Sequence, residues 1–550
     1  MFVRTTRNKS GHTYLKIVRS VRESGKVRQE ILLSLGRLDV LMATGQIDAL
    51  VAALGRFATQ QNLINLAKDV SIDKVYHLGS AHVIRRLMER TRLIDCLNAI
   101  AAEHERLELP FSELMLAMIC SRVIDPCSKK RLKEEWLKKI YPGVLRIGEV
   151  PLTQLYRTLD LLYAHREDVE NLLFDRSGER DLFNQTLDVV FYDTTTLRFE
   201  STEVEDAGLR QFGYSKERRT DCTQVVFGLL IDRDGIPVGY RLFPGNTYDG
   251  RSVPAILEKF KEKFQIGRII FVADRGMLSA DNLKSLRDAA VPFIIGMRLW
   301  SVAEDHQKDF YNLKKYRGLS PGLKIREMVW KEDRLILTWS QERSERDAKA
   351  REDILDKIQG KLKTHPDPKK FVTNQAYRQF LKGLDEGTPR IDHEAIAESR
   401  KRDGFFGVLT NVPKTELNEA NIVTRYKELW KIEDAFGEMK GPLETRPMFH
   451  WTNKRIEAHV LVCVLAYYLE AIITRTFRRK EAGLTAMEFF RGLNEVHAIP
   501  IQVKHNTVWI RNELPATAAK GYQLLQIKPP DRVLQIKENT SEVPVVVPQN

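Results

Sequence analysis

Two acidic residues in separate parts of the sequence stand where carboxylates can do chemistry. Asp193 closes the apolar run VVFYD, and Asp274 closes the apolar run IIFVAD. Both runs are short and almost wholly apolar, which is typical of strands that are covered on both faces. Each acid is therefore expected at the edge of a sheet, where loops expose it.

A third carboxylate, Glu433, lies in the segment YKELWKIEDAFGEMK, residues 426–440. The apolar residues of this segment recur at helical spacing: Leu429, Ile432, Phe436 and Met439. The segment therefore predicts a helix that is buried on one face and carries Glu433 on its rim.

Either Asp alone has an ordinary interpretation, because Asp is common at strand ends as a turn or N-cap residue. The order of the elements favours chemistry instead. A three-strand meander whose first strand ends in Asp, followed by a helix and a parallel strand ending in Asp, is the RNase H-like layout. A later helix then brings a third carboxylate across the two, and Glu433 is placed to do this.

Three carboxylates without His or Cys suit oxygen-seeking Mg²⁺ or Mn²⁺ and exclude a zinc site at this position. Such a site would hold two ions. One would activate a water or a 3′-hydroxyl, and the other would stabilise the leaving oxygen of a phosphodiester.

The elements that must position these acids form an α/β core in two parts. The first part, 181–299, contains the strand-like runs LDVVFYD, CTQVVFGLLID and IPVGYRLFPGNT, then alternating helix and strand. Residues 300–403 interrupt this rhythm and are expected to form an insertion domain. The strand FFGVLTN opens the second part, 404–480, which includes the Glu433 helix.

The flanking segments have a different character. Residues 1–39 predict a small β unit, and residues 40–180 predict a helical region with basic residues on its polar faces. Residues 481–550 are expected to be a C-terminal region that ends in a loose tail. The helical region is the expected site of DNA-end binding.

Composition points to a soluble protein with a polyanionic partner. Lys and Arg number 87 against 74 Asp and Glu, a net charge of +13 that favours nucleic acid. The apolar run VLVCVLAYYL has ten residues, about half a membrane span, and predicts a helix buried in protein. The five cysteines form no CxxC pair and no Cys/His cluster, which indicates a reducing compartment and no structural zinc.

These segments together resemble the DDE transposases of bacterial insertion sequences, in particular the group with a Y-(2)-R-(3)-E-(6)-K signature. Tyr426, Glu433 and Lys440 fill the Tyr, Glu and Lys positions, and Leu429 stands at the Arg position. Further segments that are similar to the family are FYDTTTLRFES, residues 213–247, ADRGM and RPMFHWTNKRIEAH. The resemblance covers roughly residues 120 to 475.

The resemblance implies a metal site of Asp193, Asp274 and Glu433. It also implies that Lys440 contacts a DNA phosphate near the transposon end. The other expected DNA-binding residues are Tyr426, Arg446, Lys216, Arg218 and Arg219; for the last three, a charged hairpin rim is an equally good interpretation.

The implied enzyme cuts double-stranded DNA at the ends of a mobile element and joins the freed 3′-hydroxyls to target DNA. It would act as a homodimer in a synaptic complex, without a membrane partner, in a bacterial or archaeal cytoplasm at the nucleoid. Two other functions stay open. One is an RNase H-like nuclease or resolvase without strand transfer, and the other is a DNA-binding regulator that has lost catalysis on the same fold.

Overall fold

The computed structural model spans the chain, and the described residues are 1–550 apart from thirteen short segments. These are 24–25, 56, 58–69, 73, 105–107, 176–187, 205–207, 215–220, 264–268, 365–374, 385–387, 504–505 and 539–550. The chain divides into two compact units. One comprises 1–75, 498–512 and 531–550, and the other comprises 76–497 and 513–530.

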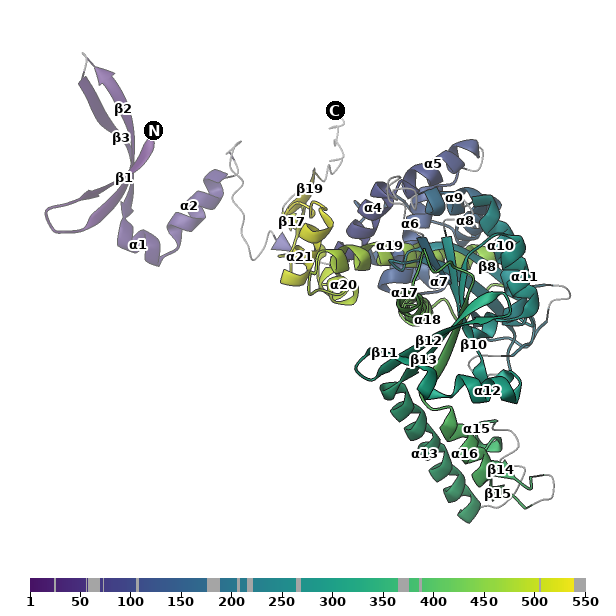
Figure 1. The fold of residues 1–550 in the computed structure, drawn as a ribbon. Helices are drawn as coiled ribbons and strands as arrows, with labels where there is room; N and C mark the ends of the chain where they lie inside the picture. The colour runs from purple at the N-terminus through teal and green to yellow at the C-terminus, as the bar shows by residue number, and fades with distance from the viewer. Residues whose placement is uncertain are drawn as a thin grey trace. The chain divides into compact units, whose positions relative to one another are not determined.

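The larger unit is built on a mixed sheet (Figure 1) whose described strands lie in the order β11-β12-β13-β16-β10-β9-β6-β7-β8. Its central strands are β6 (Asp188–Arg198), β7 (Gln224–Asp232), β8 (Pro237–Pro244), β9 (Ile269–Ala273) and β10 (Phe293–Met297). Strands β6 to β8 form an antiparallel meander, β9 is parallel to β6, and β10 is parallel to β9. This is the strand arrangement predicted from the order of apolar runs.

The sheet continues beyond β10 with β16, from the second predicted core part, and then with three strands from the range predicted as an insertion. β16 (Phe405–Thr410) pairs with β10 and β13 (Asp333–Ser340) pairs with β16, followed by β12 (Leu323–Trp330) and β11 (Arg317–Ser320). Residues 317–340 thus belong to the core sheet, because Leu335 and Leu337 are buried in its hydrophobic core.

The rest of that range is a helical subdomain at the lower end of the larger unit in Figure 1. Its elements are α13 (Gln341–Thr364), α15 (Gln375–Arg378), β14 (Leu381–Lys382), β15 (Arg390–Ile391) and α16 (His393–Lys401). Helix α12 (Glu304–Phe310) belongs instead to the main sheet, because Phe310 is buried in its core. From α13 onward these elements share a small core of Ile358, Phe380, Leu381 and Ile396.

Helices cover both faces of the sheet. α10 (Ser252–Lys263) and α11 (Ala280–Asp288) pack on one face, where Val190, Tyr192 and Phe271 share a core with Ile256 and Leu286. The other face is covered by α17 (Glu419–Lys427), α18 (Trp430–Lys440) and α19 (Asn453–Arg479). Alternate strand residues point to this second face, as the Phe227–Phe436 ring contact at 5.9 Å shows.

One described helix, α19, is long and apolar enough to cross a membrane, but 83% of its most apolar window is buried inside the protein. The run VLVCVLAYYL lies in this helix, as predicted. Around α19 pack the helices that precede the sheet, together with two that follow it. Those in contact with α19 are α4 (Gly79–Arg90), α6 (Phe111–Ile124), α8 (Leu152–Ala164), α20 (Ala486–Asn494) and α21 (Ala516–Leu525). Beside them, α5 (Leu93–Glu103) packs on α4 and α6, α7 (Lys129–Arg131) packs on α8, and α9 (Arg166–Asp175) packs on α5.

The smaller unit contains two antiparallel sheets and two short helices. The first sheet is β1 (Phe2–Arg7), β2 (Thr13–Glu23) and β3 (Lys26–Arg37), followed by α1 (Leu38–Ala43) and α2 (Gln46–Gly55). The second has the order β19-β18-β17-β4, with β4 (Val70–Ser71), β17 (His497–Val503), β18 (Asn506–Arg511) and β19 (Val533–Glu538). Strand β19 lies in the segment predicted as a loose tail, which is corrected here because β19 pairs with β18 along its length.

Candidate active site

Asp193 and Asp274 lie side by side on neighbouring parallel strands. Tyr192 of β6 is opposite Ala273 of β9, and each Asp is the next residue along the chain. Asp274 directly follows β9. Asp193 was expected at the end of its strand, but it lies in the middle of β6, because β6 continues to pair with β7 as far as Arg198. Asp274 keeps an extended backbone, with φ −72° and ψ 164°. Residues paired on adjacent strands are roughly 5 Å apart and share a face. Since Tyr192 faces α10 and α11, both carboxylates lie on the opposite face, which α17 and α18 cover.

Asp274 is held in place by Tyr426, in the last turn of α17. The Tyr426 hydroxyl donates a hydrogen bond to Asp274 Oδ1 at 3.0 Å. Burial, and secondly the charge of Asp274, raise the pKa of Tyr426 well above its ordinary value. The hydroxyl therefore stays protonated and acts as the donor.

Gly296 on β10 makes room for this hydroxyl. A Cβ at this position would lie 2.4 Å from Tyr426 Oη and 3.0 Å from its Cζ, so no larger residue fits without displacing the tyrosine. The Tyr426 ring also packs against Phe406, with centroids 5.0 Å apart. Gly296 was not singled out from the sequence, although an isolated glycine in the apolar run PFIIGM is a signal of close approach.

The segment 426–440, predicted as one helix, is divided between two. Tyr426 belongs to α17, and α18 begins at Trp430 with Leu429 as its N-cap. The four predicted apolar residues, Leu429, Ile432, Phe436 and Met439, are all buried. Leu429, at the family's Arg position, is 7% exposed and therefore packs at the junction of the two helices.

Helix α18 runs in the same direction as β6. Lys431 Nζ lies 5.8 Å from the Phe191 ring centroid, and Lys440 Nζ donates a hydrogen bond to Thr195 Oγ1. From Lys431 to Lys440 the helix rises about 13.5 Å, and from Phe191 to Thr195 the strand extends about 13 Å. The two stretches therefore have the same length and can lie alongside each other. Glu433 is then offset by only about 4 Å along this direction from Asp193, which lies midway between Phe191 and Thr195.

Glu433 is exposed and makes no hydrogen bond or ion pair with the residues that the structure describes. Its neighbour Glu428, in contrast, contacts Arg425 and Lys431. The ligand atoms of Asp193, Asp274 and Glu433 are not all within 4.8 Å of one another. A pair of ions 3.5–4 Å apart requires carboxylates spread more widely than a single ion does.

Three further predicted DNA-binding residues, Lys216, Arg218 and Arg219, lie outside the described residues. Arg446 is half-buried and directly precedes the segment that pairs with the end of β6, where Met448 N donates to Arg198 O at 3.1 Å. Arg446 thus lies near the same end of β6 as Lys440.

The donor set of the candidate site consists of oxygen atoms. The described cysteines are free, and all but Cys96 are buried. The rings of His450 and His459 are in contact, with centroids 5.1 Å apart and planes tilted by 47°, and burial lowers the pKa of His450 to about 3. Both are packed, neutral side chains, so the carboxylates on this face of the sheet fit a hard divalent cation such as Mg²⁺.

Comparison with known proteins identifies the family. Residues 184–469, more than half of the chain, match the transposase DDE domain. The chain belongs to the DDE transposase family. Residues 3–67 match the N-terminal domain of IS1634 family transposases.

Two solved structures show distant similarity. One is the piggyBac transposase synaptic complex with hairpin DNA, at 11% identity and a TM-score of 0.36, covering 77% of this chain and 82% of that chain. The other is the Mos1 transposase paired-end complex with the left transposon end, at 17% identity and a TM-score of 0.14, covering 31% and 54%. No curated protein matches the chain.

The family match and the mixed sheet confirm the predicted fold class, a mixed α/β protein with an RNase H-like core. They also confirm the predicted enzyme class, a DDE transposase that acts on DNA. Enzymes of this family depend on divalent metal ions, in agreement with the predicted dependence of this chain.

Proposed function

We propose that this transposase cleaves DNA at the ends of its mobile element and joins the freed 3′-hydroxyls to target DNA at one carboxylate site, Asp193, Asp274 and Glu433. The main support is the placement of Asp193 and Asp274 side by side on the face covered by α17 and α18. The three carboxylates would hold two Mg²⁺ or Mn²⁺ ions, which supply a nucleophile and stabilise the leaving oxygen when bound.

The side chains around the site have separate roles in this proposal. Tyr426 was predicted to contact DNA, but its hydroxyl is occupied by Asp274, so we assign it the role of a positioning residue. The backbone N–H of Thr194 donates to Asp193 Oδ1 at 2.7 Å and limits the rotation of that carboxylate. Cleavage and joining are both in-line attacks on phosphorus, so one fixed carboxylate arrangement serves both steps.

Lys440 and Arg446 would bind the phosphates of the transposon end. Lys440 Nζ contacts Thr195, two residues beyond Asp193 on the same face of β6. Neighbouring residues on one face of a strand are about 6.6 Å apart, so the ammonium group lies within reach of a phosphate adjacent to the scissile bond. Its compact charge suits backbone binding more than base reading.

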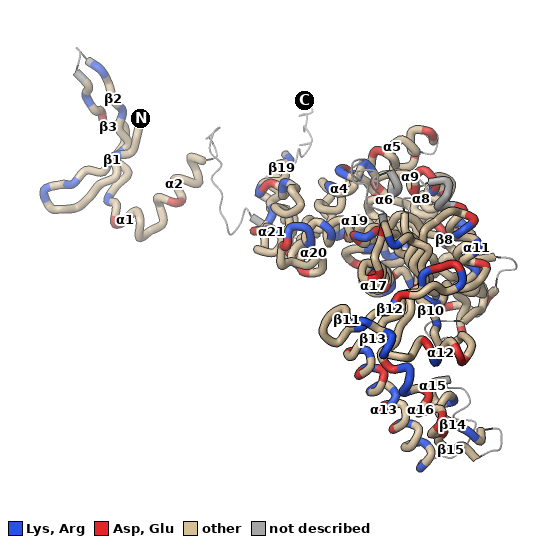
Figure 2. Tube along the Cα trace, in the orientation of Figure 1, with Lys and Arg blue, Asp and Glu red and all other residues tan. Residues whose placement is uncertain are grey.

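Recognition of the terminal repeats would fall to the first sheet of the smaller unit and to the helical region. Figure 2 shows basic residues along all three strands of that sheet, where Glu23 and Glu30 are the only acids. The basic residues are Arg4, Arg7, Lys16, Arg19, Arg22, Lys26, Arg28 and Arg37. Synapsis of two transposon ends would require two copies of the chain, which we propose form a homodimer on DNA.

The proposal is tested with DNA that carries the element's flanking repeats. With Mg²⁺, the wild-type protein should nick both ends and give joined products. Asp193→Asn, Asp274→Asn and Glu433→Gln should each abolish nicking while binding to end DNA persists. Asp434→Asn, which changes an exposed acid adjacent to Glu433, is the matched control and should stay active.

Ca²⁺ in place of Mg²⁺ should support binding without cleavage, because the larger ion tolerates irregular coordination and does not favour the octahedral geometry of Mg²⁺. A variant that still nicks removes its residue from the site. Cleavage without metal contradicts the mechanism. Nicked ends without any joined product favour the nuclease interpretation.

A further inference from the structure

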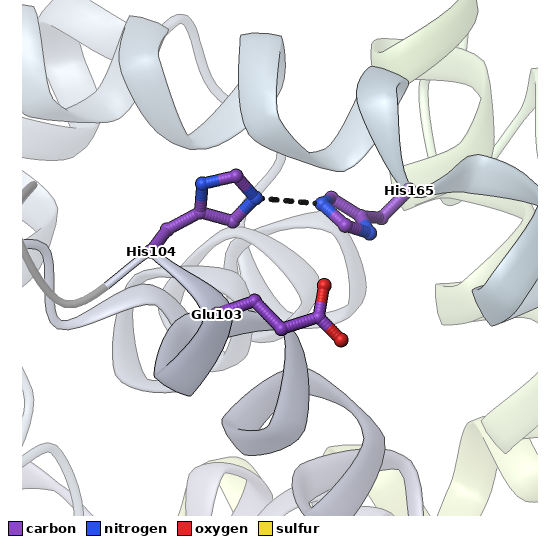
Figure 3. Close-up of side chains that lie close together, drawn as sticks. All are labelled: Glu103, His104 and His165. Carbon is purple, nitrogen blue, oxygen red and sulfur yellow. Dashed lines mark hydrogen bonds between the residues drawn. The ribbon is translucent and has the colours of Figure 1, made fainter.

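A second group of potential metal ligands lies in the helical region. Figure 3 shows the side chains of Glu103, His104 and His165 turned toward one another. Within the residues that the structure describes, these are the three His, Cys, Asp or Glu side chains whose ligand atoms all lie within 4.8 Å. The Nε2 atoms of His104 and His165 are 2.8 Å apart, and the two rings meet edge to face.

The ligands come from two helix ends that are distant in sequence. Glu103 is the last residue of α5 and His104 is its C-cap. His165, 61 positions later, is the C-cap of α8 and directly precedes α9. A residue at a helix C-cap has left the helical repeat, so its side chain is free to turn toward the neighbouring helix end.

A fourth residue, Asp168, orients the His165 ring through its other nitrogen, Nδ1. Its Oδ2 lies 3.0 Å from His165 Nδ1, on the side of the ring opposite Nε2. A metal-binding histidine usually donates its second ring N–H to a carboxylate, which fixes the tautomer and leaves the other nitrogen unprotonated. With Nδ1 as the donor to Asp168, Nε2 of His165 presents its lone pair to His104 and Glu103.

We propose that Glu103, His104 and His165 bind one Zn²⁺ ion, with Asp168 as the outer hydrogen-bond partner. This departs from the expectation of no structural zinc, which rested on the cysteine pattern, because this group contains no cysteine. Two imidazole nitrogens and a carboxylate oxygen are common zinc ligands, and three protein ligands leave a fourth position for water. This site differs in chemistry from the carboxylate site of Asp193, Asp274 and Glu433, which contains no nitrogen donor, and it does not depend on the proposed function of that site.

The geometry requires only a small adjustment. Zn–N bonds of 2.0–2.1 Å at a tetrahedral angle place two nitrogens roughly 3.3 Å apart. The two rings must therefore separate by about 0.5 Å from the 2.8 Å that they show as a hydrogen-bonded pair. Bound zinc would link the end of α5 to the α8–α9 junction, and so stabilise the helical region against local opening.

The test uses full-length protein freed of metal by a chelator and dialysed into buffer with excess Mg²⁺, which occupies the carboxylate site. Titration with Zn²⁺, followed by calorimetry, should give one tight equivalent. Co²⁺ in place of Zn²⁺ should give the visible absorption of a tetrahedral site with nitrogen ligands. Zn²⁺ should also raise the melting temperature.

Variants separate the proposed site from other sources of binding. Glu103→Gln and His165→Gln should each lose the tight equivalent and the Zn²⁺-dependent rise in melting temperature. Asp168→Asn, which touches no ion, should weaken zinc binding by about 10–100-fold. His393→Gln, at an exposed histidine of α16, is the matched control and should bind as the wild type does.

Zinc titration of Asp193→Asn distinguishes the proposed zinc site from the carboxylate site. Retention of the zinc equivalent in this variant supports a separate site, whereas its loss shows that the ion occupies the carboxylate site and overturns the proposal. Tight binding that persists in His165→Gln, or no binding by wild-type protein, also overturns it and leaves the two histidines as a hydrogen-bonded pair. If His165→Gln does not fold, the affinity change in Asp168→Asn decides.

Discussion

The contact between Gly296 and Tyr426 provides a direct test of how Asp274 is positioned. Gly296→Ala would place a Cβ 2.4 Å from the tyrosine hydroxyl, well inside van der Waals contact. The hydroxyl must then move away from Asp274, to which it now donates at 3.0 Å. Tyr426→Phe removes the same hydrogen bond without adding any atom, so the two substitutions form a double-mutant cycle.

The expected magnitudes follow from these contacts. Overpacking a buried site costs about 1–3 kcal/mol, and loss of a hydrogen bond to a charged group costs about 1.5–3 kcal/mol. In the Tyr426→Phe background the clashing oxygen is absent, and the Cζ contact at 3.0 Å remains. In that background Gly296→Ala should lower the free energy of unfolding by less than half of its cost in the wild-type protein. The coupling free energy between the two substitutions is then about 1–2 kcal/mol.

Two assays measure the cycle. Urea unfolding gives the stability of each variant, and single-turnover cleavage of end DNA gives the rate. Loss of about 1.5–3 kcal/mol from the positioning of Asp274 corresponds to a roughly 10- to 150-fold slower cleavage in either single variant. Gly318→Ala is the control, because this strand glycine has no atom within 4 Å of the added Cβ.

The reasoning is refuted if Gly296→Ala costs the same free energy in both backgrounds, since the tyrosine hydroxyl would then not be the group displaced. It is also refuted if both single variants cleave DNA at the wild-type rate. In that case the hydrogen bond to Asp274 has no part in the reaction.

Two other predictions concern Lys440 and Glu470. Lys440→Ala should reduce the slope of log affinity for end DNA against log salt concentration by about 0.9, the value for one phosphate contact. Lys284→Ala, on α11, is the control and should leave the slope unchanged. Equal slopes for the wild type and Lys440→Ala would contradict the contact. Burial, and secondly the charge of Glu438, raise the pKa of Glu470 to about 7. A carboxyl with a raised pKa in the folded state contributes fully to stability below its unfolded pKa of about 4.5, and this contribution is lost as the pH rises through 7. The free energy of unfolding of Glu470→Gln, measured in urea relative to wild type, should therefore be higher at about pH 8 than at about pH 5 by up to about 3 kcal/mol. A difference between variant and wild type that does not change with pH would contradict the assignment.

The apolar runs were informative because burial on both faces of a central strand requires nearly every residue to be apolar. This requirement is local, so the runs that end in Asp193 and Asp274 predicted β6 and β9. The apolar spacing around Glu433 predicted the buried face of α18 for the same reason. The family resemblance then linked the three acids, and the match to the DDE domain confirmed the family.

Other features required the tertiary structure. The break between α17 and α18 is invisible to periodicity, because Tyr426 and the α18 face fit one helical repeat. The role of Tyr426 depends on a glycine far earlier in the chain, Gly296; a lone glycine in an apolar run signals close approach, but only the tertiary structure shows that Tyr426 is the group that approaches. The sequence pattern of β12 and β13 shows that they are strands, but it does not show which strands they pair with. Their place in the core sheet was therefore visible only in the structure, where β13 pairs with β16.

The sequence by itself thus determined the buried faces of β6, β9 and α18, because backbone geometry imposes a period of about 2.0 or 3.6 residues on any buried face. Only the tertiary structure decided which side chains from distant segments come together. Tyr426 with Asp274, Lys440 with Thr195 and His104 with His165 are pairs of this kind. Their contacts depend on strand register and helix packing, which are set by the whole core.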